Sequence, residues 1–332
     1  MKIKKIKKND FDGYIQFGSL SNFLKKTKRD KHLERLNKKR DFFKRKIEDV
    51  KNQKKRDCIV CGSKKKQEVF SKFGFKHNLC KNCEFLYVDP TLNEEITHSN
   101  FLNEDSYTKV LLNKENINLD KKKFLYSLQK LNISLKNKSV LDIGCGFGFF
   151  LDVARDFGCK VYGSELNKSC LNLLKKKNIP LVNNYENYHE KFDIVSLWLV
   201  LEHLFDPGAL LKYVHRLLKK NGRLIINIPN YKSLTARILK EKCTMFSGEQ
   251  HINFFSKKNL EEFLFNNSFE TISSETVISD LGTVKDFLSY SNNKSSLLKE
   301  TDLDFLEPDI IHKNDLGYTI LNISRKIPKS RK

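Results

Sequence analysis

The sequence predicts an α/β fold in which a mostly parallel sheet carries helices on both faces. Beyond residue 138, short apolar runs alternate with amphipathic stretches, and this alternation is typical of strands joined by helices. Within residues 140–150, a buried-strand pattern runs into three glycines at every second position, and a helical pattern follows at once. The next apolar run ends on an acidic residue, Glu165. Strand, glycine turn and distal carboxylate together indicate a small-molecule cofactor site at the carboxyl edge of the sheet.

The apolar runs predict a seven-stranded, Rossmann-like sheet. Each run is short and bounded by turn residues, and the seven lie near residues 139–143, 160–164, 179–182, 192–198, 223–228, 269–276 and 317–325. The expected helices lie near residues 148–157, 167–177, 207–219 and 257–266. Ser256 is a suitable N-cap for the last of them, because its hydroxyl can accept a hydrogen bond from the first turn.

Four of the eight cysteines form two close pairs, Cys58 with Cys61 and Cys80 with Cys83, separated by eighteen residues. This spacing is typical of zinc sites, because each pair can turn two thiolates toward one point and four sulfurs complete a tetrahedral shell. Such a closed site is structural, and the metal would contribute folding free energy that so short a segment cannot obtain from a core. Two disulfides or four unligated thiols are the alternatives, and His77 is an alternate ligand.

The glycine turn reads VLDIGCGFG over residues 140–148 and resembles the first motif of the class I S-adenosylmethionine-dependent methyltransferases. Residues 192–204 and 217–229 resemble the fourth and fifth strands of that family, and the resemblance covers about residues 120–326. It implies S-adenosylmethionine as the cofactor. By the same resemblance, Glu165 binds the ribose hydroxyls and Leu166 packs on the adenine. The other implied cofactor-binding residues are Asp142, Gly144, Cys145, Gly146, Gly148, Leu197 and Trp198. The resemblance leaves Trp198 open between a side chain facing the acceptor and a core aromatic.

A four-cysteine module ahead of such a domain is similar to the sugar C-methyltransferases of deoxysugar pathways. It is also similar to bacterial methyltransferases associated with surface-polysaccharide assembly. In those relatives a glycine stands where this chain has Glu84, and an Arg-Pro pair that follows is absent here. The resemblance therefore implies a small-molecule acceptor, with a sugar or nucleotide-linked sugar as the specific expectation.

His251 and His203 are the candidate general bases. A base is needed only if the acceptor must lose a proton, since the donor sulfonium is already activated and the protein mainly aligns the reactants. His251 lies in a loop after the fifth strand, and a structural histidine bonded to backbone is its alternative. Glu202 and His203 resemble a pair found after the fourth strand in many relatives. Metal-dependent relatives carry a further Glu three residues earlier, where this chain has Leu199, so we expect no catalytic metal.

The chain divides by composition into four expected parts. Residues 19–56 have apolar positions at intervals of three and four and are expected to be helical, with Ser19 or Ser21 as the cap. Residues 280–315 have no clear period and are expected to form a lid or an insertion. The four parts are a basic helical arm (1–57), a zinc-binding module (58–90), a helical linker (91–135) and the S-adenosylmethionine-binding methyltransferase domain (136–326).

The arm carries +13 of the net charge of +22. Attraction to phosphate in nucleic acid, a nucleotide-linked substrate or anionic lipid is one interpretation, and a solvated basic helix is the favoured one. The arm lacks interleaved arginine and aromatic residues, so nucleic acid is not favoured. No apolar run approaches the roughly 18 residues of a membrane span, and the first residues lack a secretory signal. We therefore expect a cytoplasmic protein with reduced thiols, whose oligomeric state the sequence does not specify.

Three functions compete at this stage. Methyl transfer to a small molecule is the leading hypothesis. An RNA methyltransferase using the basic arm is the second, although the Asn/Asp-Pro-Pro-Tyr motif of many base-amine methyltransferases is absent after the fourth strand. A non-catalytic scaffold that retains the fold is the third.

Overall fold

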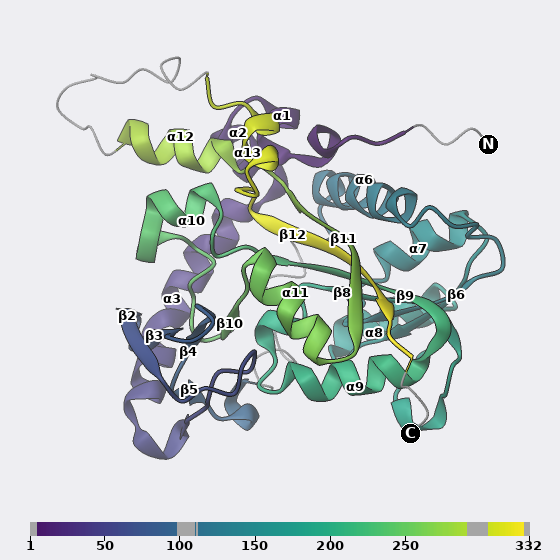
Figure 1. The fold of residues 1–332 in the computed structure, drawn as a ribbon. Coiled ribbons are helices and arrows are strands. Elements are labelled where there is room, and N and C mark those ends of the chain that lie inside the picture. Colours follow the sequence, from purple (N-terminus) through teal and green to yellow (C-terminus); the bar gives the residue numbers. More distant parts are fainter. Residues whose placement is uncertain (1–4, 98–109, 111, 291–304, 329–332) are drawn as a thin grey trace.

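A computed structural model describes residues 5–97, 110, 112–290 and 305–328 (Figure 1). Its central sheet has six strands in the order β11-β12-β9-β8-β6-β7. The strands are β6 (Ser139–Ile143), β7 (Lys160–Ser164), β8 (Phe192–Trp198), β9 (Leu218–Pro229), β11 (Phe269–Val277) and β12 (Thr319–Lys326). Four of them, β7, β6, β8 and β9, pair in parallel, and β12 is antiparallel to both of its neighbours. The predicted α/β, mostly parallel fold is therefore confirmed.

The third expected strand, near 179–182, is reduced to one parallel bridge between Leu181 and Gly163. Its backbone still exchanges two hydrogen bonds with the edge of β7, from Gly163 to Pro180 and from Val182 to Gly163. Proline has no N–H to donate, so a longer ladder at this edge is interrupted. The sheet thus has six strands plus a single bridged residue in place of the seventh.

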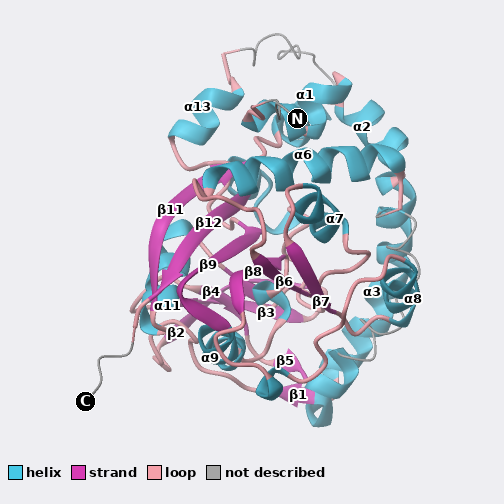
Figure 2. Cartoon of the chain, turned by 90° about the vertical axis from the view of Figure 1, so that its right-hand side faces the viewer, coloured by secondary structure: helices cyan, strands magenta, loops and turns pink. Residues whose placement is uncertain are grey.

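Helices cover both faces of the sheet, as the alternating pattern predicts (Figure 2). One face packs on α6, α7 and α8, and the opposite face packs on α9 and α11. Their bounds are α6 (Lys114–Lys130), α7 (Phe149–Asp156), α8 (Lys168–Lys176), α9 (Pro207–Leu217) and α11 (Lys257–Asn266). Ser256 caps α11 as expected, since its hydroxyl accepts a hydrogen bond from the N–H of Asn259.

The cysteine segment is built into the body through a shared sheet. Its strands β2 (Lys66–Lys72), β3 (Phe75–Cys80) and β4 (Leu86–Val88) are antiparallel, and β10 (Asn253–Phe254) from the body completes the sheet. A two-stranded pair, β1 (Gln53–Lys54) with β5 (Thr91–Leu92), flanks it. Cys58, Cys80 and Phe85 belong to the same apolar core as α9 and α11. The segment therefore shares both backbone pairing and core with the central sheet.

The N-terminal arm is helical but broken. After η1 (Lys8–Phe11) and α1 (Gly13–Phe17), the stretch 19–56, expected as a surface helix or a helical pair, contains the pair α2 (Leu20–Thr27) and α3 (Arg29–Glu48). The break falls at Lys28, whose φ of 60° is left-handed and ends α2. Ser19 caps α2 by accepting a hydrogen bond from the N–H of Asn22.

The remaining elements are short and lie outside the sheets. They are α10 (Leu234–Leu239), α12 (Leu281–Tyr290) and α13 (Pro308–Lys313), together with the short turns η2 (Val50–Asn52), η3 (Tyr185–Asn187), η4 (Leu201–His203) and η5 (Lys240–Lys242). The stretch 280–315, expected as a lid or insertion, contains α12 and α13, and its residues 291–304 lie outside the described part. No helix among the described residues is long and apolar enough to cross a membrane.

One buried side chain joins the arm to the body. Asp12 is 1% exposed and caps α1, and its other carboxylate oxygen accepts hydrogen bonds from the N–H and the hydroxyl of Ser279 at 2.7 and 2.6 Å. These hydrogen bonds therefore fix the arm to the segment between β11 and α12.

We predict that Asp12→Ala lowers the free energy of unfolding by about 1–3 kcal/mol, because it removes the cap and leaves the Ser279 donors buried without a partner. Chemical denaturation measures the change. Asp41→Ala removes an exposed carboxylate from α3 and serves as the control. Equal stability of the two variants would contradict a stabilising interaction between Asp12 and Ser279.

Candidate functional site

The glycine turn joins β6 to α7, and its three glycines have different surroundings. Gly144, Gly146 and Gly148 have φ values of 70°, 51° and 72°, in the left-handed region that favours glycine. An added Cβ would meet Val200 at 2.9 Å from Gly144, and side chains at 2.8 Å from Gly148. At Gly146 it would meet nothing within 4 Å. Two glycines therefore allow close packing, while Gly146 faces open space where a ligand can approach the backbone.

Glu165 follows β7 and turns toward the glycine turn, as expected for a ribose-binding residue. Its carboxylate accepts hydrogen bonds from the N–H groups of Gly146 at 2.7 Å, Leu166 at 2.7 Å and Asn167 at 2.8 Å. A carboxylate offers about four acceptor positions, so about one remains for a ligand hydroxyl. The side chain is thus held in place by backbone donors before any ligand arrives.

Asp142 lies at the carboxyl end of β6 and is 2% exposed. Burial raises the pKa of its carboxyl well above the ordinary range, the hydrogen bond from Ser196 at 2.7 Å opposes that rise, and the negative charge of Glu165 adds to it. Two carboxyl groups beside one turn favour a positively charged ligand, because a nearby cation would lower the free energy of the ionised form.

The other expected cofactor-binding residues differ in exposure. Leu166 is 61% exposed beside the glycine turn, whereas Cys145 is buried beneath it and burial raises its pKa. Leu197 is completely buried in the core on the α9 face, so its side chain does not line an open surface. Trp198 packs with its ring 4.7 Å from that of Phe124 and 5.2 Å from that of Phe150. Among the two roles left open for Trp198, these contacts favour the core aromatic.

The two candidate bases lie together with a buried acid. The rings of His203, in η4, and His251, in the loop before β10, have centroids 4.8 Å apart. The Nδ1 atoms lie 3.0 Å from the carbonyl oxygens of Gln250 and Met245, respectively, which places the Nδ1 proton toward those carbonyls. The Nε2 atom of His203 lies 4.0 Å from the carboxyl of Glu202.

Burial sets the protonation of these three side chains. It raises the pKa of Glu202 to about 8, and neither carboxyl oxygen has a hydrogen-bond partner among the described residues. Burial also lowers the pKa of His203 to about 3 and that of His251 to about 4. At neutral pH the cluster therefore holds a protonated carboxyl and two neutral imidazoles.

The acid and the two imidazoles also present three ligand-type atoms within 4.8 Å of one another, a spacing that one cation could span. Leu199, which is 39% exposed, stands where metal-dependent relatives of the resembled family carry a further carboxylate. Among the described residues, no further carboxylate joins this set.

The four paired cysteines converge as their spacing predicts. The four sulfur atoms lie within 4.8 Å of one another, and Cys58 is 3.5 Å from Cys83 and Cys61 is 3.5 Å from Cys80, sulfur to sulfur. Sulfurs on a tetrahedral zinc ion, with bonds of about 2.3 Å, lie about 3.8 Å apart, so the donor set fits that ion. His77 does not belong to the set, because it is buried against the ring of Phe70 at 4.4 Å.

The residue after each cysteine pair adopts the same left-handed backbone. Gly62 has a φ of 71° and Glu84 a φ of 57°. In both turns the N–H of this residue donates to the carbonyl of the first cysteine of its pair, at 2.8 and 3.0 Å. This conformation favours glycine, and Glu84 adopts it at some cost in backbone strain.

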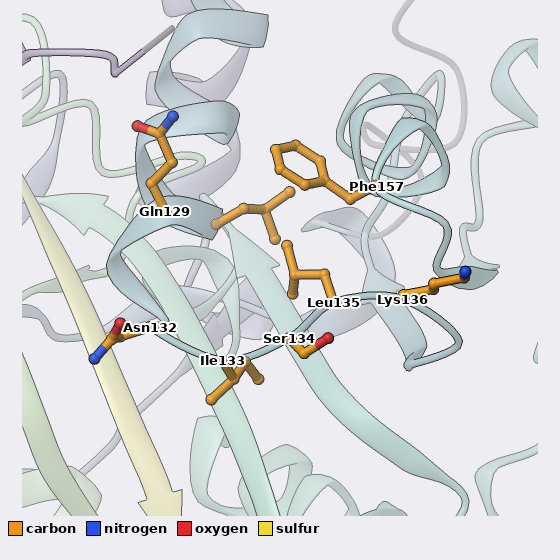
Figure 3. Close-up of a pocket in the computed structure, with 8 residues that line it drawn as sticks. Gln129, Asn132, Ile133, Ser134, Leu135, Lys136 and Phe157 are labelled. Carbon is orange, nitrogen blue, oxygen red and sulfur yellow. The ribbon is translucent and has the colours of Figure 1, made fainter. Parts of the chain in front are cut away.

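A surface hollow of about 480 Å³ is lined by residues outside the glycine turn and the acid–histidine cluster (Figure 3). It is lined by Leu135 and Lys136, just before β6, and by Phe157, just after α7, together with the end of α6. These residues surround the amino end of β6, whereas the glycine turn follows its carboxyl end. The hollow is therefore separate from the candidate site.

Residues 118–274 match the family described as a methyltransferase domain. Over 137 residues the chain is 28% identical to the ubiquinone biosynthesis O-methyltransferase of Hydrogenovibrio crunogenus. The aligned region covers 37% of this chain and 54% of that protein. Over 108 residues it is 31% identical to the protein of the same name from Coxiella burnetii. That aligned region covers 30% of this chain and 46% of the relative. The chain thus spans about half the length of these curated relatives.

Among solved structures, the chain is similar to the Burkholderia thailandensis 1,6-didemethyltoxoflavin-N1-methyltransferase with bound S-adenosylhomocysteine. The TM-score is 0.47 at 14% identity, over 80% of this chain and all of that one. The domain match and the names of the relatives support an enzyme, and the chain has an α/β, Rossmann-like methyltransferase fold.

Several groups at the site were not predicted from the sequence. Ser196 donates to Asp142, and the hydroxyls of Ser164 and Tyr185 share a hydrogen bond of 2.8 Å beside Glu165. Serine in a strand carries no distinguishing pattern. Only the parallel register of β6 with β8, which pairs Asp142 with Ser196, could have pointed to the first.

We predict that Glu202→Gln changes how stability depends on pH. The raised pKa means that the folded state keeps its proton up to about pH 8, whereas the unfolded chain loses it near pH 4.5. The wild type therefore loses stability as the pH rises between those values, by up to about 1.4 kcal/mol per pH unit. The glutamine does not titrate. Between pH 5 and pH 8, the unfolding free energy of the wild type should therefore fall by about 2 kcal/mol or more beyond the fall seen for the variant.

Urea denaturation across that pH range provides the measurement. Glu186→Gln alters an exposed carboxylate and should follow the wild type. Parallel curves for Glu202→Gln and the wild type would show that Glu202 is ionised in the folded protein.

Proposed function

We propose that this chain transfers the methyl group of S-adenosylmethionine to a small molecule. The observation that carries the proposal is the pair of Glu165 and Gly146, in which a backbone-held carboxylate faces an open glycine. The cofactor fits the groups present, since its ammonium and sulfonium charges suit the carboxyls of Asp142 and Glu165. Its ribose hydroxyls suit the remaining acceptor position of Glu165.

When bound, S-adenosylmethionine supplies an activated methyl group on a positively charged sulfur. The residues of the chain then have three tasks. The glycine turn and Glu165 hold the cofactor, the carboxyl edge of the sheet orients it, and the acid–histidine cluster serves the acceptor. The Nε2 atom of His203 or His251 accepts the proton that the acceptor loses as the methyl group arrives, and passes it on to solvent.

A sugar or a nucleotide-linked sugar of surface-polysaccharide or secondary metabolism is the acceptor class that we favour. The four-cysteine segment ahead of the domain supports this class, through its likeness to the sugar C-methyltransferases. The relatives named as O-methyltransferases show that this domain also serves oxygen acceptors in other chains. RNA methylation and a non-catalytic scaffold remain the outcomes against which the proposal is tested.

We further propose that Cys58, Cys61, Cys80 and Cys83 hold one structural zinc ion. Support comes from the convergence of four sulfurs and from the hydrogen bonds that close both turns. The same thiols cannot all ionise so close together without a cation, since like charges at this distance disfavour each other. On this basis we retain the division into arm, zinc module, linker and methyltransferase domain as a proposal.

Equilibrium binding tests the cofactor. We expect the zinc-loaded wild type to bind S-adenosylmethionine in the micromolar range in calorimetry, and Glu165→Ala to bind at least about tenfold more weakly, a loss of about 1.4 kcal/mol. Asp156→Asn, at the exposed end of α7, is the control and should bind like the wild type. Absence of binding to folded wild type would overturn the proposed function.

Metal analysis tests the zinc ion. The purified protein should contain about one zinc per chain, and Cys80→Ser should lose it and unfold at a lower temperature, because metal binding contributes folding free energy. Cys159→Ser alters a buried cysteine outside the cluster and should keep the metal. Full metal content in Cys80→Ser would contradict the assignment.

The acceptor is identified by incubating the protein with labelled S-adenosylmethionine and cell extract, followed by mass spectrometry of the product. Label in a sugar fraction supports the favoured acceptor, and label in RNA supports the alternative. Failure to label any fraction supports the scaffold.

A further inference from the structure

The turn that carries Glu202 and His203 has little structure of its own. It consists of the three-residue η4 between β8 and α9. The backbone N–H of Ile252 donates to the carbonyl of Glu202 at 2.8 Å, and His203 lies against the carbonyl of Gln250. The relative placement of the two histidines therefore depends on how the turn and residues 250–253 are held together.

Asn253 holds both ends of this turn through its side-chain amide. Its side chain is 1% exposed, and its amide nitrogen donates to the carbonyls of Leu201 at 2.9 Å and Leu204 at 2.7 Å, which bracket the Glu202–His203 pair. Its amide oxygen accepts from Nη2 of Arg56 at 2.6 Å. An arginine can only donate, so it fixes the amide orientation and directs both N–H groups toward the turn.

Arg56 lies at the end of the arm, two residues before Cys58, where the chain enters the cysteine segment. Its backbone N–H donates to Asp89 at 2.8 Å, and its guanidinium lies 5.3 Å from the ring of Phe205, the residue that follows the turn. The side chain is 7% exposed, and its Nε and Nη1 atoms have no hydrogen-bond partner among the described residues. Burying a charge with two nitrogens unpaired costs free energy, and the nearby carboxylate of Asp89 and the rings of Tyr87 and Phe205 offset part of that cost.

We propose that Arg56 and Asn253 are positioning residues that hold the Glu202–His203 turn opposite His251. The end of the arm, which leads into the cysteine segment, then has a role of its own, because it supplies the arginine that orients the acid–histidine cluster. The catalytic meaning of this brace rests on the proposed function, whereas the brace itself is tested without cofactor or acceptor.

The arm contains the same arrangement at a distance from the cluster and offers a matched control. Arg29 donates through Nε and Nη2 to the amide oxygen of Asn116 at 3.3 and 3.2 Å. The amide nitrogen of Asn116 donates to the carbonyls of Thr27 and Val110 at 3.0 and 2.7 Å. Asn116 is 2% exposed, so Asn116→Asp disturbs a buried pair of the same chemistry.

The test is nitrogen-15 spectroscopy of the histidines in the full-length, zinc-loaded protein, since long-range proton–nitrogen spectra show which ring nitrogen carries the proton. His203→Gln and His251→Gln assign the two signals. In the wild type we expect the proton of His203 on Nδ1. Asn253→Asp removes both donors to the turn, and Arg56→Met releases the amide, so both should shift His203 away from this state. Arg56→Lys should restore the signal in part, because an ammonium can still donate to the amide oxygen.

The control separates positioning from general loss of packing. Asn116→Asp should leave the His203 signal unchanged, and all of these variants should bind S-adenosylhomocysteine within about twofold of the wild type. Once a methylated product is found, Asn253→Asp and Arg56→Met should lower turnover by about tenfold or more at similar cofactor affinity. If Asn253→Asp fails to fold, the two arginine variants, which keep the asparagine, decide the question.

An unchanged His203 signal in Arg56→Met and Asn253→Asp would overturn the brace, and so would an equal shift in Asn116→Asp. Loss of S-adenosylhomocysteine binding by the wild type would instead overturn the proposed function and leave the histidine result intact.

Discussion

The parallel pairing of β6 with β7 and β8 is the constraint on which the rest of the site depends. Strands that run in the same direction end at the same edge, so Asp142, Glu165 and the turn after Trp198 are brought together although they are far apart in the sequence. The in-register pairing of Asp142 with Ser196 then supplies the hydrogen bond that the buried carboxyl requires. Cofactor chemistry and acceptor chemistry both start from this edge.

The two halves of the edge have opposite electrostatic character. On the cofactor side, a buried carboxyl and a carboxylate lie beside an open glycine and favour a cation. Around η4, where we propose that the acceptor binds, burial keeps Glu202 protonated and His203 and His251 neutral. An uncharged acceptor can lie beside such a neutral cluster without the free-energy cost of burying an ion.

Features with a local signature were predictable from the sequence. The glycine turn, the distal Glu165, the cysteine spacing and the caps at Ser19 and Ser256 each depend on residues a few positions apart, and the structure contains all of them. Features that depend on distant partners were not. The two-residue strand β10 completes the sheet of the cysteine segment through pairing with β4, and no local pattern marks so short a strand.

Energetic competition explains the other differences between prediction and structure. Residues 53–54, expected to be helical, instead pair with Thr91 and Leu92 as strand β1, because backbone pairing with a distant segment outweighs local helix propensity. Pro180 reduces the edge strand to one bridge. Arg56 and Asn253 carry no motif at all, since a buried arginine–asparagine pair is defined by its place in space.

The position of β12 between two earlier strands determines the order in which the central sheet can form. This strand lies between β9 and β11, so β11 has no partner on that side until residues 319–326 have left the ribosome. The matched domain ends at residue 274, before this strand begins, and a nascent chain of that length presents two unpaired edges. Completion of the sheet is therefore expected to be a late step of folding, with β12 inserted between two strands that precede it in the sequence.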